Sequence, residues 1–132
     1  AVRRRFPRYS LGAEVELEFI HNDLLLVDQR IRVPGRILDI SVQGLMIESL
    51  HCPPSGVVFD LRVSFAGTPL EAELGRSNYQ FVCQVKWSAP GRPSRLGVSF
   101  IQISEEEERR LQDALASAQE RGVLKLLSEP VS

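Results

Sequence analysis

The chain has 132 residues, of which 43% are hydrophobic and 25% charged, and its formal net charge is −1. This length can bury a real hydrophobic core but is too short for two ordinary domains. No apolar run reaches the roughly 18 to 20 residues that a membrane-spanning helix requires, so we expect neither membrane insertion by this chain nor a signal peptide.

Cysteine and histidine are too sparse to predict a disulfide framework or a metal site. Of the two cysteines, Cys52 and Cys83, the second lies in an apolar strand pattern, where a reduced thiol acts as a small core residue. This favours a cytoplasmic protein, or a cytoplasmic module of a larger one. His21 and His51 lie in segments typical of turns, and neither has a second ligand at metal spacing, so we expect no metal and no cofactor.

Positive charge is concentrated at the N-terminus. Four arginines lie within six residues: Arg3, Arg4, Arg5 and Arg8. The rest of the chain carries 12 basic side chains (16 minus these four) against 17 acidic ones. Because Pro7 disfavours a helix, we expect residues 1–10 to form a flexible, extended arm. The hydrogen-bond donors of a guanidinium group match the acceptors of a phosphate or of the O6/N7 edge of guanine. The cluster therefore favours an anionic ligand. The alternative is a solvated basic tail without a ligand.

The first predicted strand begins near Ala13. Apolar residues there alternate strictly with acidic ones, as in a half-buried antiparallel strand: Val15, Leu17 and Phe19 against Glu14, Glu16 and Glu18. Residues 30–41, with Leu38 and Ile40 on the core face, and residues 45–50 predict the next two strands. We expect these two to form a hairpin in which Gly44 adopts a positive φ.

The second half of the chain predicts more strands and then a helix. Residues 57–65, 79–88 and 96–103 show strand patterns, and the second of these places four side chains on one face: Phe81, Cys83, Val85 and Trp87. Ser104 and Glu107 form a capping box at the start of a helix. Its apolar stripe consists of Leu111, Ala114, Leu115 and Ala118. Gly122 is a natural stop, and residues 123–127 are apolar enough to dock on the domain or on a partner.

Five or six short strands with regularly spaced turns, followed by one helix, favour an all-β fold, a small antiparallel barrel. We place the barrel at residues 11–103, the C-terminal helix at residues 104–127 and a tail at residues 128–132.

Two polar side chains lie near the end of the strand predicted at residues 30–41. Asp39 and Ser41 are two positions apart, so we expect both to point away from the core, side by side. A carboxylate there can accept from the N1 and N2 donors of guanine, and a hydroxyl can donate to a phosphate. Gly44 would let a ligand approach the backbone closely. The alternative is an Asx or Ser/Thr turn that only caps the hairpin.

The two groups of polar residues together resemble the signature of the PilZ domain, the bacterial receptor module for cyclic di-GMP. Arg4-x-x-x-Arg8 is followed by Asp39-x-Ser41-x-x-Gly44 at a strand end. Residues 85–87 and 96–100 are similar to the closing strands of that family, and the helix follows them. The resemblance covers nearly the whole chain, and both motifs are intact.

The resemblance implies a six-stranded antiparallel barrel of Greek-key type, with the ligand held between the N-terminal arm and the outer barrel surface. Arg4 and Arg8 would contact phosphates and the Hoogsteen edge of guanine, while Asp39 and Ser41 would hold a second base and Gly44 would give the ligand room. Arg3 matches a position at which members with arginine bind two mutually intercalated ligand molecules. Trp87 would either flank a guanine or lie in the core.

We therefore predict a cyclic di-GMP receptor domain. Ligand would order the arm over the barrel, and the signal would pass to a partner protein or a neighbouring domain. One alternative is an adaptor of the same fold that signals without ligand. A single-stranded nucleic-acid binder would need a basic groove with exposed aromatics, which the negative net charge disfavours. No histidine is placed to complete a triad with Asp39 and Ser41, and the sequence contains no phosphate-binding glycine loop, so we expect no enzyme.

Overall fold

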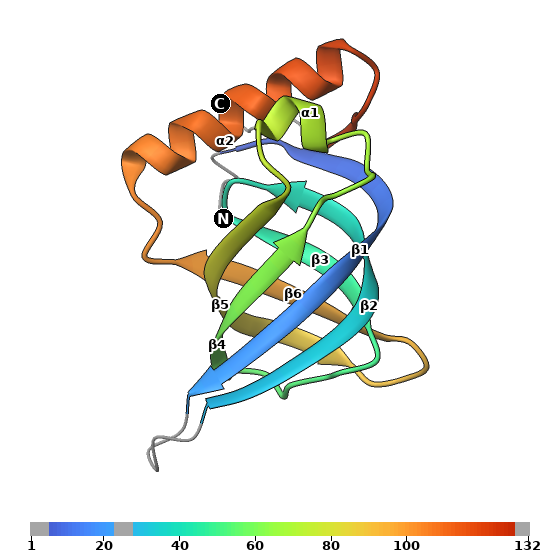
Figure 1. The fold of residues 1–132 in the computed structure, drawn as a ribbon, viewed down its shortest axis with the longest axis vertical. Helices are drawn as coiled ribbons and strands as arrows, with labels where there is room; N and C mark the ends of the chain where they lie inside the picture. Colours follow the sequence, from blue (N-terminus) through green and yellow to red (C-terminus); the bar gives the residue numbers. More distant parts are fainter. Residues whose placement is uncertain (1–5, 23–27, 129–132) are drawn as a thin grey trace.

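The computed structural model describes residues 6–22 and 28–128, and this part of the chain is mostly strand (Figure 1). The strands are β1 (Arg8–Asn22), β2 (Asp28–Ser41), β3 (Gly44–Ser49), β4 (Val58–Ser64), β5 (Asn78–Ala89), β6 (Ser94–Ile101) and β7 (Lys125–Ser128). The helices are α1 (Glu71–Leu74) and α2 (Glu105–Glu120). Neither of these two helices is long and apolar enough to span a membrane.

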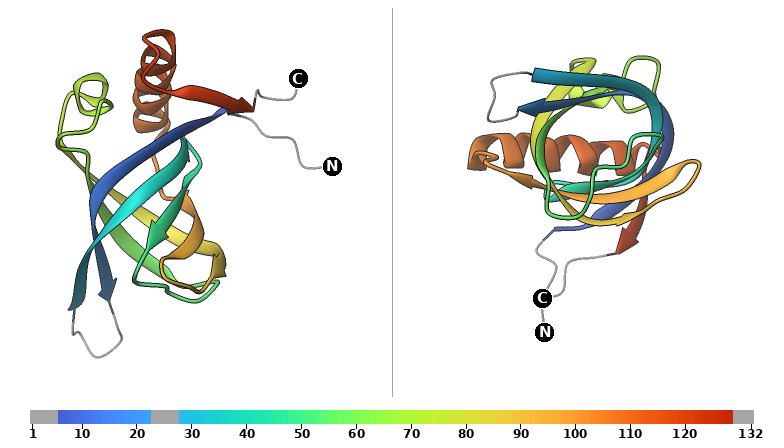
Figure 2. Two further views of the ribbon diagram at one scale, coloured as in Figure 1. Left: turned by 90° about the vertical axis from the view of Figure 1, so that its right-hand side faces the viewer. Right: turned by 90° about the horizontal axis from the view of Figure 1, so that it is seen from below.

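Six of the strands close into an antiparallel barrel. Neighbouring strands follow the order β2-β3-β6-β5-β4-β1, and β1 pairs again with β2, which closes the ring. Figure 2 shows the closed ring from one end. Closure gives every barrel strand a partner on both edges, which removes the exposed edges on which sheets aggregate. The predicted small antiparallel barrel with a C-terminal helix is confirmed.

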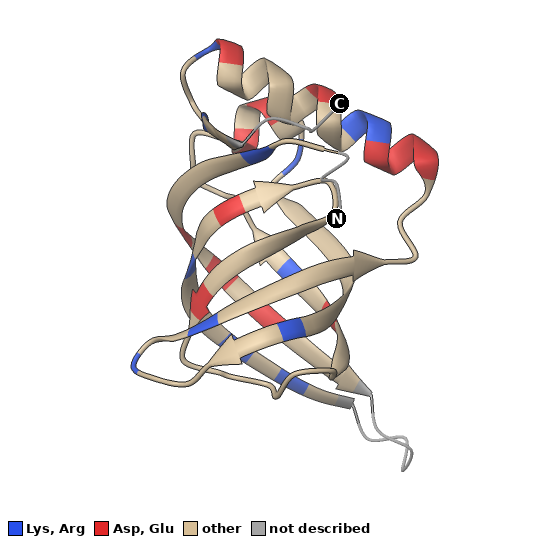
Figure 3. Ribbon diagram, turned by 180° about the vertical axis from the view of Figure 1, so that it is seen from behind, with Lys and Arg blue, Asp and Glu red and all other residues tan. Residues whose placement is uncertain are grey.

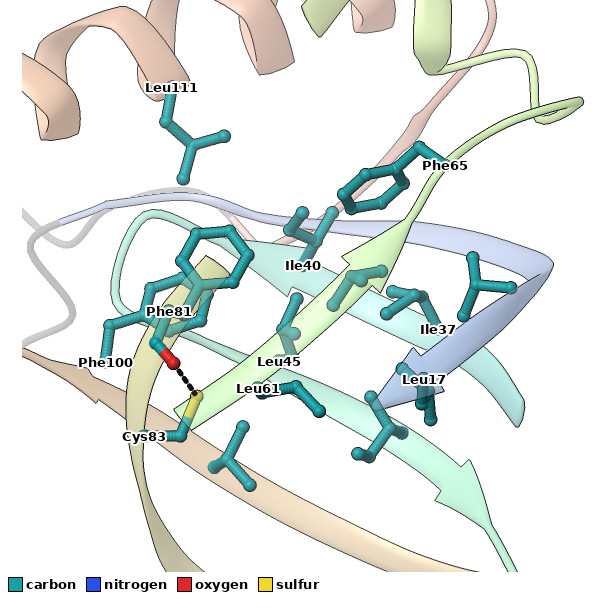
Figure 4. Close-up of a cluster of buried hydrophobic side chains, with 14 of the residues drawn as sticks. Leu17, Ile37, Ile40, Leu45, Leu61, Phe65, Phe81, Cys83, Phe100 and Leu111 are labelled. Atoms are coloured by element: carbon teal, nitrogen blue, oxygen red, sulfur yellow. Dashed lines mark hydrogen bonds between the residues drawn. The ribbon is translucent and has the colours of Figure 1, made fainter. Parts of the chain in front are cut away.

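The barrel interior is filled by the alternating apolar residues of its strands (Figure 4). Leu17 and Phe19 are fully buried, as the alternation in β1 predicted. Phe81 of β5 and Phe100 of β6 stack with ring centroids 4.2 Å apart. Burying each such side chain stabilises the fold by about 1.5–3 kcal/mol. The core is therefore continuous from strand to strand around the ring.

The alternation of inward and outward side chains in β2 shifts by one residue between Ile37 and Asp39. Ile37 pairs with Ile47, whereas Asp39 pairs with Met46, so Leu38 is the extra residue of a β-bulge. Ile37 and Ile40 are fully buried, while Leu38 is only half-buried. The expectation that Leu38 shares the core face with Ile40 is therefore wrong, because a bulge shifts the two-residue period.

The helix α2 lies across one end of the barrel (Figure 1). Its N-cap is the predicted one, since Ser104 Oγ accepts from the Glu107 amide at 3.1 Å. The predicted stripe is buried at Leu111, Leu115 and Ala118. Gly122 follows the helix with a φ of 77°, the left-handed conformation that ends helices. The dipole-matched acidic first turn of α2 is visible in Figure 3.

The last described strand, β7, lies beside the start of β1. β1 begins at Arg8, inside the segment assigned to the arm, and α2 ends at Glu120. β7 takes up the end of the segment assigned to the helix and the first residue of the tail. β7 pairs with β1 over residues 8–10 (Figure 2). The apolar segment after α2 thus docks on the domain itself, as an added strand. The short helix α1 was not predicted.

Candidate ligand-binding site

An open pocket of about 240 Å³ lies on the barrel surface where β1 begins and β2 ends. Five of the predicted site residues line it: Arg8, Asp39, Ser41, Gly44 and Trp87. They come from β1, β2, β3 and β5. Arg3 and Arg4, the other predicted site residues, lie outside the described residues. The fold therefore gathers every predicted site residue within the described part of the chain into one place.

The centre of the pocket is an ion pair between Arg8 and Asp39. Arg8 Nη2 donates to Asp39 Oδ2. The pairing of β1 with β2 places them together, because Ser10 lies opposite Asp39 and Tyr9 opposite Ile40. The Arg8 side chain is 32% exposed, whereas the Asp39 side chain is 6% exposed. A buried carboxylate requires a hydrogen-bonded partner, and Arg8 supplies it while part of its five-donor guanidinium stays open to solvent.

Asp39 and Ser41 differ from expectation in their burial. The residues that alternate with them, Ile40 and Val42, fill the core, so Asp39 and Ser41 do belong to the outer face of β2. Ser41 is nevertheless only 7% exposed. Arg8 contacts Asp39 on this face through the ion pair. The outer face of a strand is thus not the same as the solvent-exposed surface.

Ser41 caps the hairpin turn. Its Oγ accepts from the Gln43 amide at 3.0 Å, which is the Ser/Thr turn considered as the alternative role for this residue. The turn has two residues, since Ser41 pairs with Gly44. Phe100 of β6 donates its amide to the Gln43 carbonyl at 2.8 Å and ties the turn to the neighbouring strand. The hydroxyl also lines the pocket, where its O–H can rotate toward a ligand.

Gly44 allows two strands to pack closely and does not have the positive φ expected of it. Positive φ is found at five described glycines, and Gly44 is not one of them, so the predicted positive φ is wrong. A Cβ at this position would lie 2.0 Å from the Val98 carbonyl oxygen. The described structure thus uses Gly44 to bring the backbones of β3 and β6 close together, directly under the pocket.

Trp87 lies on the outside of the barrel. Val85 pairs with Val98 and Trp87 with Gly97, so Lys86 is the extra residue of a β-bulge. The bulge rotates the next side chain outward, and Trp87 is 44% exposed. A Cβ on Gly97 would lie 2.1 Å from Trp87 Nε1, so the indole rests on the bare backbone of β6. The core alternative for Trp87 is therefore wrong, and its ring is available to the pocket.

Comparison with known proteins identifies the fold. A family model of the PilZ domain matches residues 2–117, most of the chain and both motifs. The chain belongs to the PilZ domain family. A search of curated proteins gave no match.

Two solved structures share the PilZ fold of this chain at low sequence identity. One is YcgR from Escherichia coli in complex with c-di-GMP, with a TM-score of 0.66 and 19% identity over 90% of this chain. The other is the isolated PilZ domain of YcgR with c-di-GMP, with a TM-score of 0.61 and 18% identity over 92% of this chain and 95% of that one. The chain spans 47%, about half, of the longer YcgR chain.

A larger hollow of about 680 Å³ lies elsewhere on the surface of this PilZ domain, beside Glu18 of β1. Glu18 is buried and accepts from Arg32 at 3.1 Å, with Arg30 and Arg62 also within ion-pair distance. The hollow contains none of the predicted site residues. Its charges already neutralise one another in part, so size alone does not make it the candidate site.

Proposed function

We propose that this PilZ domain is a cyclic di-GMP receptor, which binds its ligand at the pocket around Arg8 and Asp39 and catalyses no reaction. One observation carries the proposal. Two motifs that lie 31 positions apart meet in a single ion pair, beside an outward-facing tryptophan. Both similar YcgR structures are described as complexes with c-di-GMP.

The chemistry of the pocket suits a guanine dinucleotide. The exposed part of the Arg8 guanidinium would bind a phosphate or the O6/N7 edge of guanine. Each charge-assisted hydrogen bond contributes about 1.5–3 kcal/mol. Asp39 holds Arg8 in place, and Trp87 offers a flat face on which a base would stack, worth about 1–3 kcal/mol. The pocket therefore combines the two kinds of contact that this ligand needs.

The N-terminal arm would complete the site. At about 240 Å³ the described pocket is smaller than the roughly 300 Å³ at which ligand pockets begin. A further wall is needed, and Arg4 stands four residues before Arg8 in the sequence. We propose that ligand orders the arm across the barrel and that Arg3 allows a second, intercalated ligand molecule to bind.

The strand that carries Arg8 offers a route for the signal. Tyr9, the next residue, is 2% exposed, and Gln112 Nε2 of α2 donates to its hydroxyl at 3.2 Å. Tyr9 also pairs with Leu126 of β7. A ligand that repositions Arg8 would therefore act on α2 and β7. We propose that a partner protein or a neighbouring domain reads this change in the cytoplasm.

Calorimetric titration with cyclic di-GMP tests the proposal. We expect the wild type to bind, Arg8→Ala and Asp39→Ala to weaken binding at least about tenfold each, and Arg3→Ala to lower the stoichiometry from two ligands to one. Arg5→Ala is the matched control, because Arg5 is outside the motif. Ligand recovered after overnight incubation should be intact by chromatography.

Each contrary result has a definite meaning. No heat from the folded wild type would favour the alternative, an adaptor of the PilZ fold that works without ligand. Unchanged affinity in both Arg8→Ala and Asp39→Ala would place the ligand elsewhere on the domain. Binding of a single-stranded oligonucleotide in the same cell would support a nucleic-acid binder instead.

A further inference from the structure

The barrel end opposite the ligand pocket contains a pair of histidines in direct contact. His21 Nε2 and His51 Nε2 are 2.9 Å apart, although the residues are 30 positions apart in sequence. His21 lies in β1, near its end, and not in a turn as predicted. His51 follows β3. The sequence predicted no metal at either residue because neither has a nearby ligand along the chain, and only the fold brings them together.

Strand alternation explains why the two rings converge. His21 continues the inward-facing series Val15, Leu17 and Phe19, and His51 lies two positions beyond the buried Ser49 at the end of β3. β1 and β3 are not neighbours in the sheet, since β2 lies between them. The imidazoles therefore meet across the interior at the barrel end and not along a strand pair. Both are half-buried, so water reaches them.

Aromatic packing fixes the orientation of both rings. Phe19 lies parallel to His21, with centroids 6.4 Å apart, and edge-on to His51 at 4.8 Å. Phe59 contacts His21 at 5.6 Å. The His51 amide also donates to Ser49 Oγ at 3.0 Å, which holds the backbone. At 2.9 Å the two Nε2 atoms are at hydrogen-bond distance, so one ring donates and the other accepts in the metal-free pair. The apolar surroundings hold both nitrogens close together, as a designed metal site requires of its ligands.

We propose that His21 and His51 form a binding site for a divalent transition metal of the class that prefers imidazole, such as Zn²⁺, Ni²⁺ or Cu²⁺. Metal–nitrogen bonds of about 2.0–2.1 Å at a tetrahedral angle set the two nitrogens about 3.3 Å apart. The pair reaches this separation by opening about 0.4 Å, while the donating imidazole moves its proton from Nε2 to Nδ1 so that both Nε2 atoms can bind the metal. Imidazole nitrogen suits these metals, whereas Mg²⁺ and Ca²⁺ prefer oxygen ligands.

The protonation state of the pair agrees with this role. Burial lowers the pKa of both imidazoles, and for His51 the neighbouring His21 charge lowers it further. Neutral imidazole is the form that binds a metal. Among the described residues, no group of three or more histidine, cysteine or acidic side chains surrounds the pair, so water would complete the coordination. The affinity should therefore be lower than that of a closed structural zinc site.

Titration of the untagged chain with NiCl₂ and with ZnCl₂ tests the proposal. We expect one metal per chain, and at least about tenfold weaker binding in His21→Gln and in His51→Gln. Cys52→Ser is the matched control, because Cys52 adjoins His51 and is the partly exposed thiol. It should leave the affinity unchanged. Circular dichroism checks that each variant is folded.

The wild type alone also gives a decisive result. The chain has two histidines, so its imidazole NMR signals report on this pair alone. Sub-stoichiometric Cu²⁺ should broaden both ring signals before any others. Absence of Ni²⁺ and Zn²⁺ binding would overturn the proposal, and so would a site that persists in both glutamine variants. Cyclic di-GMP binding should survive in those variants, since the two sites lie at opposite ends of β1.

Discussion

Trp87 Nε1 lies against Gly97 so closely that a Cβ on that glycine would be 2.1 Å away. The outward position of the indole therefore depends on the bare backbone of β6. We expect Gly97→Ala to displace Trp87 from the pocket and to weaken cyclic di-GMP binding. Trp87 is the single tryptophan of the chain, so its fluorescence measures the displacement directly.

Comparison of Gly97→Ala with Trp87→Ala tests whether the indole contacts the ligand. Trp87→Ala in the native Gly97 background should weaken binding about as much as Gly97→Ala, by about 1–3 kcal/mol, if stacking is the shared cause. Normal affinity in Gly97→Ala, together with shifted fluorescence, would mean that the indole does not contact the ligand.

Gly44→Ala is expected to destabilise the domain. Its Cβ would meet the Val98 carbonyl oxygen at 2.0 Å, and backbone atoms cannot rotate away as a side chain can. Overpacking of this kind costs about 1–3 kcal/mol. Urea unfolding measures the loss, with Gln43→Ala as control, because Gln43 is exposed in the same turn. Equal stability of Gly44→Ala and the control would show that β3 and β6 can move apart freely.

The Arg8–Asp39 pair should also stabilise the ligand-free fold. Removing Arg8 leaves a buried carboxylate without its partner, which costs about 1–3 kcal/mol. We expect Arg8→Ala and Asp39→Ala each to lower the free energy of unfolding. The double variant should lose less than the sum of the two, with a coupling of at least about 0.5 kcal/mol. Additive losses would mean that the pair contributes nothing to stability.

The two cysteines should differ sharply in reactivity. Burial raises the pKa of the Cys83 thiol, with the Asp60 charge as a second cause, and this residue is fully buried in the core. The thiolate is the reactive form, so Cys83 should resist alkylation in the native state. Mass spectrometry after iodoacetamide should find Cys52 modified and Cys83 intact. Modification of both thiols should require unfolding, for instance in urea.

Part of the site could be predicted because it depends on local sequence. The strict alternation of Val15, Leu17 and Phe19 predicts a half-buried strand, and the capping residues predict where α2 begins. The resemblance of the two motifs to the PilZ signature predicted the family, and it singled out Arg8, Asp39, Ser41 and Gly44, which line one pocket. These signals can be read from the sequence because each pattern or motif spans only a few neighbouring positions.

Other features depend on one extra residue or on distant strands. Lys86 and Leu38 are each the extra residue of a β-bulge. A bulge reverses the direction in which the following side chains face, and the residue types in the strand do not reveal it. That is why Trp87 could be assigned either to the core or to the surface.

The sequence alone predicted a small antiparallel barrel, because strand period and turn residues are local features of the chain. Its two motifs pointed to the PilZ domain through their resemblance to the signature of that family. Only the tertiary structure decided that Arg8 pairs with a buried Asp39, that Trp87 faces outward and that His21 meets His51. The first and the last depend on which strands become neighbours when the barrel closes, and the second depends on a one-residue bulge, and none of these can be read from a local pattern.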